Sequence, residues 1–420
     1  MRYLYSVLFY LLLPLLFIRL WWRSRRMPAY RERIWERIGY YPFKLDKCIW
    51  VHAVSMGETL AAVPLIKALQ ERYPHLPIVV TTMTPTGAEQ VKKSFADSVK
   101  HVYVPYDFPG AVNRFLRAMN PVIGIIMETE MWPNLLSAMQ QKNIPVCLLN
   151  ARLSEKSARG YARISSLTRK MLSCICTIAA HGHKDAARFI ELGADEKYVV
   201  VTGNLKFDLQ LTEDLIANSN VLRQQLGGNR FIWIAASTHE GEEEIVLAAH
   251  KKVLKQNKDA LLILVPRHPD RFNTVTNLIQ QNDLILARRS HQDVCLPETN
   301  VYLGDTMGEL LVMYGACDVA FVGGSLIPRG GHNMLEPGAL AKPILTGPHV
   351  FNFAEISDMF IASNALIKVQ DADDLAQQLQ KLMQDETLRQ TYGTRALNVV
   401  AANRGALTKQ LQLVEKFLVN

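Results

Sequence analysis

The chain has 420 residues, of which 49% are hydrophobic and 20% are charged. This composition is sufficient for two domains with full cores and excludes a wholly disordered protein. The net charge of +8 is concentrated at the N-terminus, because residues 1–47 carry ten Lys and Arg against three acidic residues, which is +7 of the total. Since the rest of the chain is nearly neutral, we exclude a broad nucleic-acid-binding surface and predict no nucleic acid partner.

The first 22 residues predict a membrane anchor. Tyr3–Trp22 is apolar except for Arg19, and about 20 such residues are needed to cross a bilayer as a helix. A cleaved signal peptide would carry its charge before the apolar run and a small-residue site after it, and this segment has the opposite order. We therefore predict an uncleaved single-pass anchor. Pro14 and Arg19 weaken a full crossing, so a segment that lies in the interface is the alternative.

The flanking residues indicate which side of the membrane holds the globular part. Trp21 and Trp22 suit the membrane–water interface, and the basic cluster Arg23, Arg25 and Arg26 predicts that the globular part is cytoplasmic. Residues 23–47 form a basic juxtamembrane segment, in which Met27–Pro42 is predicted to be an amphipathic stretch at an anionic surface.

From residue 48 the chain alternates between short β-rich runs and helical periodicity. This alternation predicts an α/β fold of two doubly wound domains with parallel sheets, at residues 48–217 and 218–420, divided near a polar, irregular stretch at 218–229. The predicted strands are Ile49–Ala53, Ile78–Thr82, His101–Val104, Val122–Met127, Val146–Leu149, Ile175–Ala179, Val199–Thr202, Phe231–Ala235, Leu261–Val265, Leu284–Ala287, Val319–Val322, Pro343–Leu345 and Ala365–Val369. Such domains bind ligands at the carboxyl ends of their strands, in a cleft between the sheets.

Acidic and basic residues follow the strands of the first domain. Glu58 begins a helix after the first strand, where it can act as a general base or, alternatively, only complement the helix dipole. Glu128 and Glu130 follow Val122–Met127, and helix capping is the favoured interpretation for Glu130. Lys206 follows the last strand and can pair with a phosphate or carboxylate, although a solvated surface lysine is the default interpretation.

In the second domain, Pro266 and Arg267 leave one strand and Met307, Gly308 and Glu309 begin a helix further on. Arg267 is suited to binding a phosphate. The sequence Asp371–Asp373 fits the D-x-D pattern of some metal sites, but it precedes a helical run and is better explained as a helix cap. The six cysteines lack C-x-x-C spacing, so we predict no metal site and no disulfide framework.

The stretch Gly323–Pro337 (GGSLIPRGGHNMLEP) is the strongest functional signal. Paired glycines let a ligand approach the backbone, and a helix beginning near His332 would present N–H groups to an anion. Glu336 in its first turn can accept hydrogen bonds from a ribose. A nucleotide site and a plain glycine-rich turn between a strand and a helix both fit the pattern taken alone, and its place late in the second domain favours the nucleotide site.

Six motifs taken together resemble one family. HAVSMGE, METEMWPN, GNLKFD, VPRHPDRF, GDTMGEL and the glycine-rich stretch occur in the order found in 3-deoxy-D-manno-octulosonic acid (Kdo) transferases of Gram-negative bacteria, and the similarity covers essentially the whole chain. The resemblance implies the GT-B architecture of two facing Rossmann-like domains. It also implies inverting transfer of Kdo from the donor CMP-Kdo to lipid IVA at the cytoplasmic face of the inner membrane, without a cofactor.

The resemblance also implies roles for single residues. Glu58 matches the proton acceptor that activates the 6′-hydroxyl of the lipid's glucosamine, and Glu128 and Lys206 match residues that stabilise the transition state. Three segments match those that bind CMP: Pro266 and Arg267, then Met307, Gly308 and Glu309, then Asn333, Met334, Leu335 and Glu336.

Two other functions fit parts of the sequence. Another GT-B enzyme, such as a UDP-sugar transferase or a nucleotide-sugar 2-epimerase, would also carry a glycine loop with a ribose-binding Glu, but an epimerase needs no membrane anchor. A catalytically idle, membrane-tethered nucleotide-binding scaffold would not need Glu58.

Overall fold

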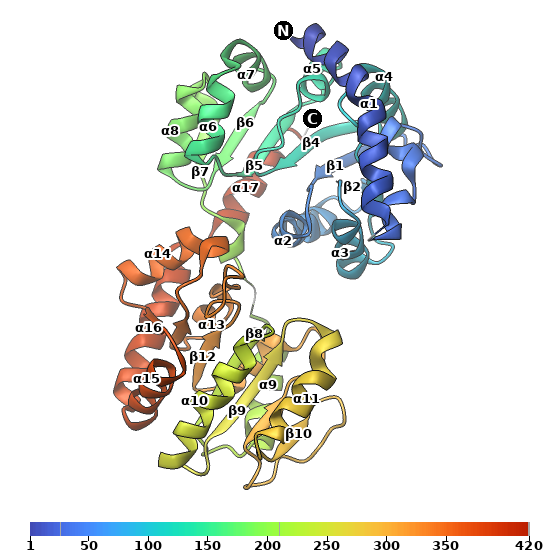
Figure 1. Ribbon diagram of the computed structural model, residues 1–420. Helices are drawn as coiled ribbons and strands as arrows, with labels where there is room; N and C mark the ends of the chain where they lie inside the picture. The colour runs from blue at the N-terminus through green and yellow to red at the C-terminus, as the bar shows by residue number, and fades with distance from the viewer. Residues whose placement is uncertain (26, 210, 419–420) are drawn as a thin grey trace. The chain divides into compact units, whose positions relative to one another are not determined.

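The computed structural model describes residues 1–25, 27–209 and 211–418, so Arg26 of the basic cluster lies outside the described residues. The chain forms two compact units (Figure 1). The N-terminal unit comprises Met1–Asp208 together with the segment from Arg404 onward, and the C-terminal unit comprises Leu209–Asn403.

The N-terminal unit is built on a seven-stranded sheet in the order β3-β2-β1-β4-β5-β6-β7, in which every pair is parallel. The central strands are continuously apolar and buried because helices cover both faces of the sheet. All seven predicted strands are confirmed, and their ends differ from the predicted ones by at most two residues. Their bounds are β1 Cys48–His52, β2 Ile78–Thr82, β3 Lys100–Tyr103, β4 Pro121–Met127, β5 Val146–Ala151, β6 Thr177–Ala180 and β7 Val199–Val201.

The helices of this unit begin with side-chain caps or prolines at several positions. Ser55, Thr84 and Ser154 cap three of them, because each side chain accepts a hydrogen bond from a backbone N–H in the first turn. The helices are α1 Arg2–Ser24, η1 Pro28–Arg31, η2 Ile34–Ile38, α2 Met56–Arg72, α3 Pro85–Phe95, α4 Pro109–Met119, α5 Pro133–Gln141, α6 Glu155–Ala162, α7 Ser165–Leu172, α8 His183–Glu191, η3 Glu196–Tyr198, η4 Leu205–Phe207 and α17 Ala406–Glu415.

The C-terminal unit has its own seven-stranded parallel sheet in the order β10-β11-β9-β8-β12-β13-β14. The six predicted strands are confirmed, and one strand that the sequence did not predict, Val301–Leu303, pairs between β9 and β10. Val301–Leu303 was missed because it is only three residues long and has polar residues on both sides, so the sequence shows no longer apolar run there. The bounds are β8 Ile232–Thr238, β9 Leu261–Pro266, β10 Leu286–Arg288, β11 Val301–Leu303, β12 Val319–Val322, β13 Ile344–Thr346 and β14 Leu366–Lys368.

The helices of the C-terminal unit complete a second α/β layer structure. Asp371 caps one of them, because its carboxylate accepts the N–H groups of Asp373 and Asp374 at 2.9 Å each, which confirms the capping interpretation of the D-x-D sequence. The helices are α9 Glu213–Gln225, α10 Glu242–Gln256, η5 Pro269–Arg271, α11 Phe272–Gln281, α12 Leu310–Ala316, α13 Leu335–Ala339, η6 Phe351–Phe353, α14 Ala354–Ala362, α15 Ala372–Gln384 and α16 Glu386–Ala402.

The structure corrects the predicted domain limits at both ends of the second unit. Residues 218–225 are helical rather than irregular, because Thr212 caps α9 and Leu222 is buried against α12. The C-terminal unit therefore starts at Leu209 rather than at residue 218. At the other end, α17 belongs to the N-terminal unit, since its apolar face joins the core formed by β1, β4 and α2.

The basic segment after α1, predicted to be an amphipathic stretch at an anionic surface, is partly buried in the N-terminal unit. It forms the two short turns η1 and η2, and Glu36 and Arg37 are buried in the N-terminal unit. Glu36 accepts the backbone N–H of Tyr103 at 2.7 Å, and Arg37 donates to the carbonyl oxygen of Met83 at 3.1 Å. These buried polar contacts fix the segment against the sheet, which the charge pattern alone did not predict.

Candidate functional site

The carboxyl ends of β1 and β4 mark the centre of the first candidate site. The chain winds outward from β1 through β2 to β3, and then from β4 in the opposite direction. The change of direction between two neighbouring parallel strands leaves a crevice, which is where open α/β sheets bind ligands. Glu58 follows β1 and Glu128 follows β4, so the structure brings these two predicted residues to the same crevice.

Glu58 lies in the first turn of α2 and is only 8% exposed. One carboxylate oxygen accepts the backbone N–H of Val54 and the other accepts the hydroxyl of Ser55, each at 2.8 Å. Burial raises the pKa of Glu58 from 4.5 to about 7, and the negative charges of Glu128 and Glu130 add to the shift, while the hydrogen bonds from Ser55 and Val54 oppose it. A carboxylate tuned close to neutral pH is suited to accepting a proton.

Glu128 and Glu130 occupy the turn after β4 with different local constraints. Glu128 has a φ of +56°, which few non-glycine residues adopt, and strain of this kind is often found at functional positions. Glu130 instead accepts a hydrogen bond from the indole N–H of Trp132 at 3.0 Å. Burial raises the pKa of Glu130, and the charge of Glu128 contributes to that rise. The capping interpretation favoured for Glu130 is wrong, because α5 has no side-chain cap and Glu130 instead binds the indole of Trp132.

Lys206 lies in η4, which packs against α2, the helix that carries Glu58. The backbone of this turn is held by Asn150 and Asn204, whose side-chain oxygens accept the N–H groups of Leu205 and Lys206 at 2.9 and 3.0 Å. The turn follows β7 at the carboxyl edge, so Lys206 belongs to the same edge of the sheet as the two carboxylates.

His181 is a residue of this edge that the sequence did not single out. It follows β6, and both ring nitrogens are buried without a hydrogen-bond partner among the described residues. Burial lowers its pKa to about 3, with a further contribution from the charges of Lys206 and Arg152. His181 therefore lies as a neutral side chain among cationic groups. No local sequence pattern marks it, because its position depends on the order of the strands.

In the C-terminal unit the crevice lies between β8 and β12, where the winding again reverses. The neighbouring strands β11, β9, β8 and β12 end on this edge. They are followed by Met307–Glu309, Arg267, His239 and the glycine-rich loop, respectively. The sheet order thus brings the predicted nucleotide-binding segments to one edge.

The glycine-rich loop is held by a carboxylate that the sequence analysis did not identify. Glu242, at the start of α10, is fully buried and accepts the backbone N–H groups of Gly324, Ser325 and Leu326 at 2.6 to 3.0 Å. The N–H groups of this part of the loop are therefore not available to an anion. Glu242 was missed because the run GEEE resembles the solvated first turn of any helix.

The second half of the loop and the ends of β8 and β9 form a basic cluster. The ring Nε2 atoms of His239 and His332 are 2.8 Å apart, and His268 lies edge-on to His239. The pKa of His239 and of His332 is lowered to about 4, mainly by burial and partly by neighbouring charges that include Arg267. The two rings are therefore uncharged at pH 7 and are joined by one hydrogen bond between their Nε2 atoms, while Arg267 can offer positive charge to a phosphate.

Glu336 lies in the first turn of α13, as predicted, but this helix begins at Leu335 rather than near His332. The side chain of Asn333 donates to one carboxylate oxygen of Glu336 at 3.1 Å and accepts the N–H of Leu335 at 3.1 Å. Burial raises the pKa of Glu336, and the positive charge of Arg267 opposes the rise. Asn333, Arg267 and Glu336 therefore form one cluster, in which Met334 and Leu335 are buried core residues.

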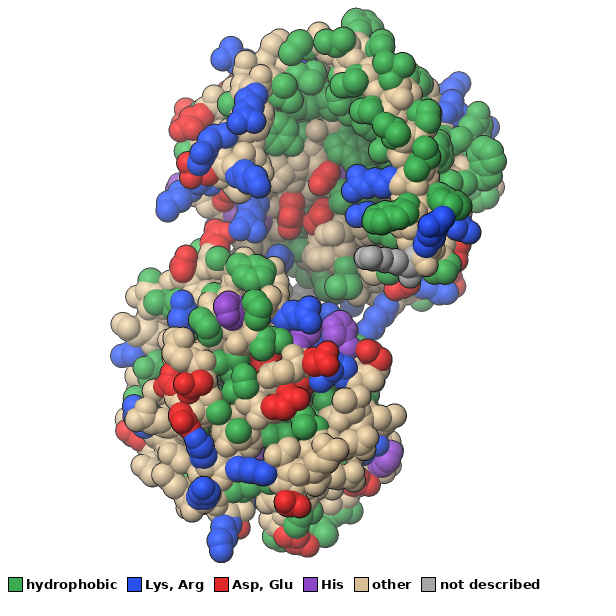
Figure 2. Space-filling view, viewed as in Figure 1, with side chains coloured by type: hydrophobic (Ala, Val, Ile, Leu, Met, Phe, Trp, Pro, Cys, Tyr) green, Lys and Arg blue, Asp and Glu red, His purple; other side chains and the backbone are tan. Residues whose placement is uncertain are grey.

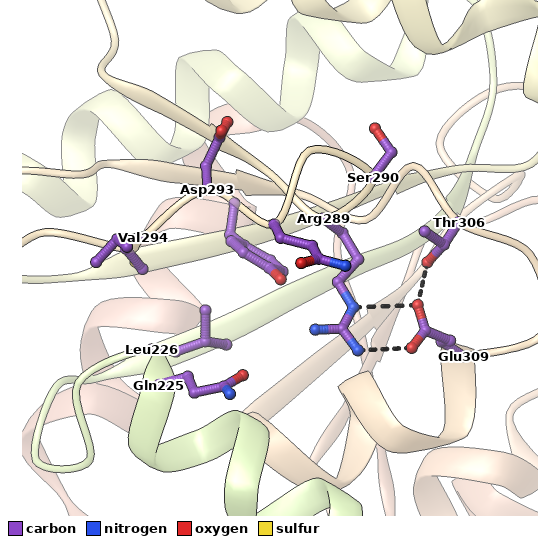
Figure 3. Close-up of a pocket in the computed structure, with 11 residues that line it drawn as sticks. Gln225, Leu226, Arg289, Ser290, Asp293, Val294, Thr306 and Glu309 are labelled. Carbon is purple, nitrogen blue, oxygen red and sulfur yellow. Dashed lines mark hydrogen bonds and ion pairs between the residues drawn. The ribbon is translucent and has the colours of Figure 1, made fainter.

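Met307, Gly308 and Glu309 form the turn before α12, with Gly308 at a φ of +92° and Met307 exposed. The carboxylate of Glu309 is bidentate to the guanidinium of Arg289 at 2.7 and 3.1 Å and also accepts the hydroxyl of Thr306 (Figure 3). These side chains line a cavity of about 620 Å³. The side chain of Glu309 is thus engaged by Arg289, which leaves the backbone of the turn to contact a ligand.

Each unit by itself has the groups for one part of a transfer reaction, either activation of an acceptor hydroxyl or binding of a nucleotide donor. The N-terminal unit presents a buried carboxylate whose pKa is close to neutral, and the C-terminal unit presents a basic cluster beside a carboxylate in a first helical turn. The first arrangement can remove a proton from a hydroxyl group, and the second can bind a nucleotide through its phosphate and ribose.

Comparison with known proteins gives the same division of the chain. A family model described as 3-deoxy-D-manno-octulosonic-acid transferase (kdotransferase) matches residues 32–209, and a model described as glycosyl transferases group 1 matches residues 229–399. The chain is 42% identical to a 3-deoxy-D-manno-octulosonic acid transferase of Haemophilus influenzae over 99% of both chains. It is 35% identical to a transferase of the same name from Bordetella pertussis, over 97% of both chains.

Solved structures with the same architecture are more distant in sequence. The UDP-GlcNAc 2-epimerase of Neisseria meningitidis aligns with a TM-score of 0.58 over 89% of this chain and all of that chain, at 14% sequence identity. This level of identity shows the fold alone. Together with the two parallel α/β units, it confirms the predicted GT-B architecture.

Proposed function

Because the chain belongs to the Kdo transferase family and is a glycosyltransferase of Kdo, we propose that it takes Kdo from CMP-Kdo and attaches it to lipid IVA, in lipopolysaccharide biosynthesis at the inner membrane. The observation that carries this proposal is Glu58, a buried carboxylate with a pKa of about 7 at the carboxyl edge of the N-terminal sheet. The donor follows from the match of the six sequence motifs to the family. The lipid acceptor is supported by the apolar helix α1, which is long and apolar enough to cross a membrane.

The proposed chemistry is a single inverting displacement. The carboxylate of Glu58 takes the proton of the 6′-hydroxyl of the acceptor as its oxygen bonds to the anomeric carbon of Kdo. The bond from that carbon to the phosphate oxygen breaks, and CMP leaves with the electron pair. Arg267 stabilises the phosphate that leaves, while Glu128 and Lys206 act on the transition state. We assign no cofactor and no metal ion to the reaction.

The direct test is an assay of the purified protein with CMP-Kdo and lipid IVA dispersed in detergent. We expect the mass of the lipid to increase by a whole number of Kdo residues and CMP to be released in equal amount. Transfer from a UDP-sugar instead would support the alternative of another GT-B enzyme. Binding of CMP-Kdo without any turnover would support the membrane-tethered scaffold.

Glu336 is proposed to bind the ribose of the nucleotide, because it lies one turn after the glycine-rich loop beside Arg267. Charge-assisted hydrogen bonds contribute roughly 1.5–3 kcal/mol each. We therefore expect Glu336→Ala to weaken CMP binding by at least about tenfold, mostly through a raised KM for the donor. The parent should prefer CMP over 2′-deoxy-CMP in calorimetry, and the variant should lose that preference. If both proteins preferred CMP over 2′-deoxy-CMP to the same extent, Glu336 would not bind the ribose, and its role would be limited to the hydrogen bond with Asn333.

A further inference from the structure

Helix α1 packs along its whole length against the N-terminal unit. Its inward-facing residues recur every three or four positions, as on one side of a helix, and include the buried Ser6, Leu20 and Ser24. Phe9, Leu13, Leu16 and Phe17 are half-buried between them, in an apolar cluster with Tyr106 and Phe108. The 23 residues of α1 make a helix about 34 Å long, so this contact extends across a large part of the unit.

Polar contacts hold both ends of α1. Near the N-terminus the hydroxyl of Ser6 donates to the side-chain oxygen of Asn134 at 3.0 Å, and Arg2 is hydrogen-bonded to Ser137. Near the C-terminus the hydroxyl of Ser24 accepts a hydrogen bond from the guanidinium of Arg31 at 2.6 Å. A helix that projected freely from the unit into a bilayer would have no such contacts at its far end.

The surface beneath α1 is made by the carboxyl edge of the sheet. Met83 follows β2, Tyr106 and Phe108 follow β3, and Asn134 lies in the first turn of α5 after β4. Asn134 is itself fixed there, because the carboxylate of the buried Asp107 accepts its backbone N–H at 3.0 Å. Glu58 and Glu128 follow strands of this same edge, so α1 and the proposed base lie on one side of the N-terminal unit.

The outward face of α1 is apolar and exposed, with a basic end. Its large exposed side chains are Tyr3, Leu4, Val7, Leu8, Tyr10, Leu11, Leu12, Leu15, Ile18, Trp21 and Trp22. Figure 2 shows hydrophobic side chains gathered where Figure 1 places α1, with Lys or Arg side chains near them. Arg19, Arg23 and Arg25 are exposed at the C-terminal half. Such a helix, apolar on its outer face with tryptophan and arginine at its end, fits the surface of a membrane that contains anionic lipids.

From this arrangement we propose that α1 lies in the plane of the membrane, with its outward face immersed in one leaflet, and does not cross the bilayer. A crossing would either separate α1 from the unit, which would expose its packed face and remove the hydrogen bond between Ser6 and Asn134, or draw Asp107 and the start of α5 into the hydrocarbon. The in-plane position avoids both, because the inner face stays on protein and only the outer face meets lipid.

The in-plane position has a consequence for the acceptor. A lipid substrate in the same leaflet has its headgroup at the level of α1, and α1 rests on the edge of the sheet that carries Glu58. The helix therefore sets the reacting edge against the surface in which the acceptor lies. The inference rests on the proposed membrane-bound acceptor, but the position of α1 can be measured without transfer activity.

The test uses the full-length protein bound to sealed vesicles of phosphatidylethanolamine and phosphatidylglycerol. A hydrophilic extension, Met-Gly-Cys-Gly-Ser in place of Met1, carries a thiol at the N-terminal end of α1 and away from its apolar outward face, and Lys258→Cys is the control on the surface of the C-terminal unit. Both are made in a background in which Cys176 and Cys295, the two partly exposed thiols, are serine. A membrane-impermeant maleimide should label both variants equally before and after the vesicles are opened with detergent. Labelling of the extension only after opening would show that α1 crosses, and would overturn the proposal.

A second measurement asks whether α1 must leave the unit in order to bind membrane. Ser6→Cys combined with Asn134→Cys is designed to link α1 to α5 by a disulfide, since these side chains are in contact. We expect the oxidised protein to bind the vesicles as well as the reduced protein. Binding that appears only after reduction would overturn the proposal. If the parent protein showed no Kdo transfer but the expected vesicle binding and labelling, this would count against the proposed function instead. Arg19→Gln should weaken vesicle binding about fivefold, and Arg404→Gln, in the loop before α17, should leave it unchanged.

Discussion

Replacing Glu58 with glutamine is expected to lower kcat for Kdo transfer by about 10²–10⁴-fold, which is what a general base typically contributes. Glutamine keeps the size of the side chain and an oxygen that can accept the N–H of Val54, so the fold should be preserved. Calorimetry should show CMP binding within a few-fold of the parent, because the predicted nucleotide-binding residues all lie in the other unit.

Glu71→Gln is the matched control, since Glu71 is exposed on the same helix. It should transfer Kdo at the parent rate. Activity of Glu58→Gln above about a tenth of the parent rate would reject the role of general base. A parallel fall in CMP affinity would indicate a folding defect instead.

The pH dependence should report the same carboxylate. Since burial raises the pKa of Glu58 from 4.5 to about 7, the rate should increase with pH up to that value as the carboxylate forms. Stability should change in the opposite direction, because the folded protein holds this proton more tightly than the unfolded chain. The contribution is present below about pH 4.5 and is lost as the pH rises towards 7. Urea titrations of the parent and Glu58→Gln should therefore converge in acid and diverge near neutral pH.

Glu242→Ala is expected to have the largest effect on the C-terminal unit. It removes the acceptor of three buried backbone N–H groups in the glycine-rich loop. An unsatisfied buried donor costs roughly 1–3 kcal/mol, so the free energy of unfolding of this unit should fall by at least about 3 kcal/mol. We also expect CMP binding to be lost, because the loop that precedes Glu336 would no longer be held. Denaturant unfolding and calorimetry measure the two effects.

Glu244→Ala is the control for this prediction, since Glu244 is exposed in the same turn of α10. It should change neither stability nor CMP binding. Glu242→Gln separates the two effects further, because an amide keeps one acceptor oxygen, and its stability should lie between those of the parent and the alanine variant. An alanine variant with normal stability would show that the loop holds its conformation without Glu242.

The fold was predicted from sequence wherever a strand is a continuous apolar run. β1, β4, β8 and β12 were all identified in this way, since strands buried on both faces need apolar side chains throughout. The strand β11 lacked this signal. The limits of the units were harder, because the placement of α17 depends on which core receives its apolar face, and a single helix fits either core by composition.

The same distinction applies to the site. Glu58 and Glu336 could be found because each follows a strand or a glycine-rich loop within a few residues. Glu242 and His181 could not, since their importance comes from partners in other parts of the chain: the amides of residues 324–326 for Glu242, and Lys206 for His181. The local sequence pattern therefore identifies residues that begin a helix after a strand. The distant groups that contact such residues become known only from the order of the strands in the sheet.

The return of the chain to the N-terminal unit in α17 affects the order in which the protein can fold during synthesis. Gln410 donates to Thr202 at 3.0 Å and accepts the backbone N–H of Asn150, and Asp208 accepts the N–H groups of Gly405 and Leu407. Because α17 follows the C-terminal unit in sequence, it leaves the ribosome after that unit, and the first half of the chain must wait for it before its core is closed. The second unit, which is continuous in sequence, can be complete before the first, so the nucleotide-binding half is expected to mature ahead of the half that carries Glu58.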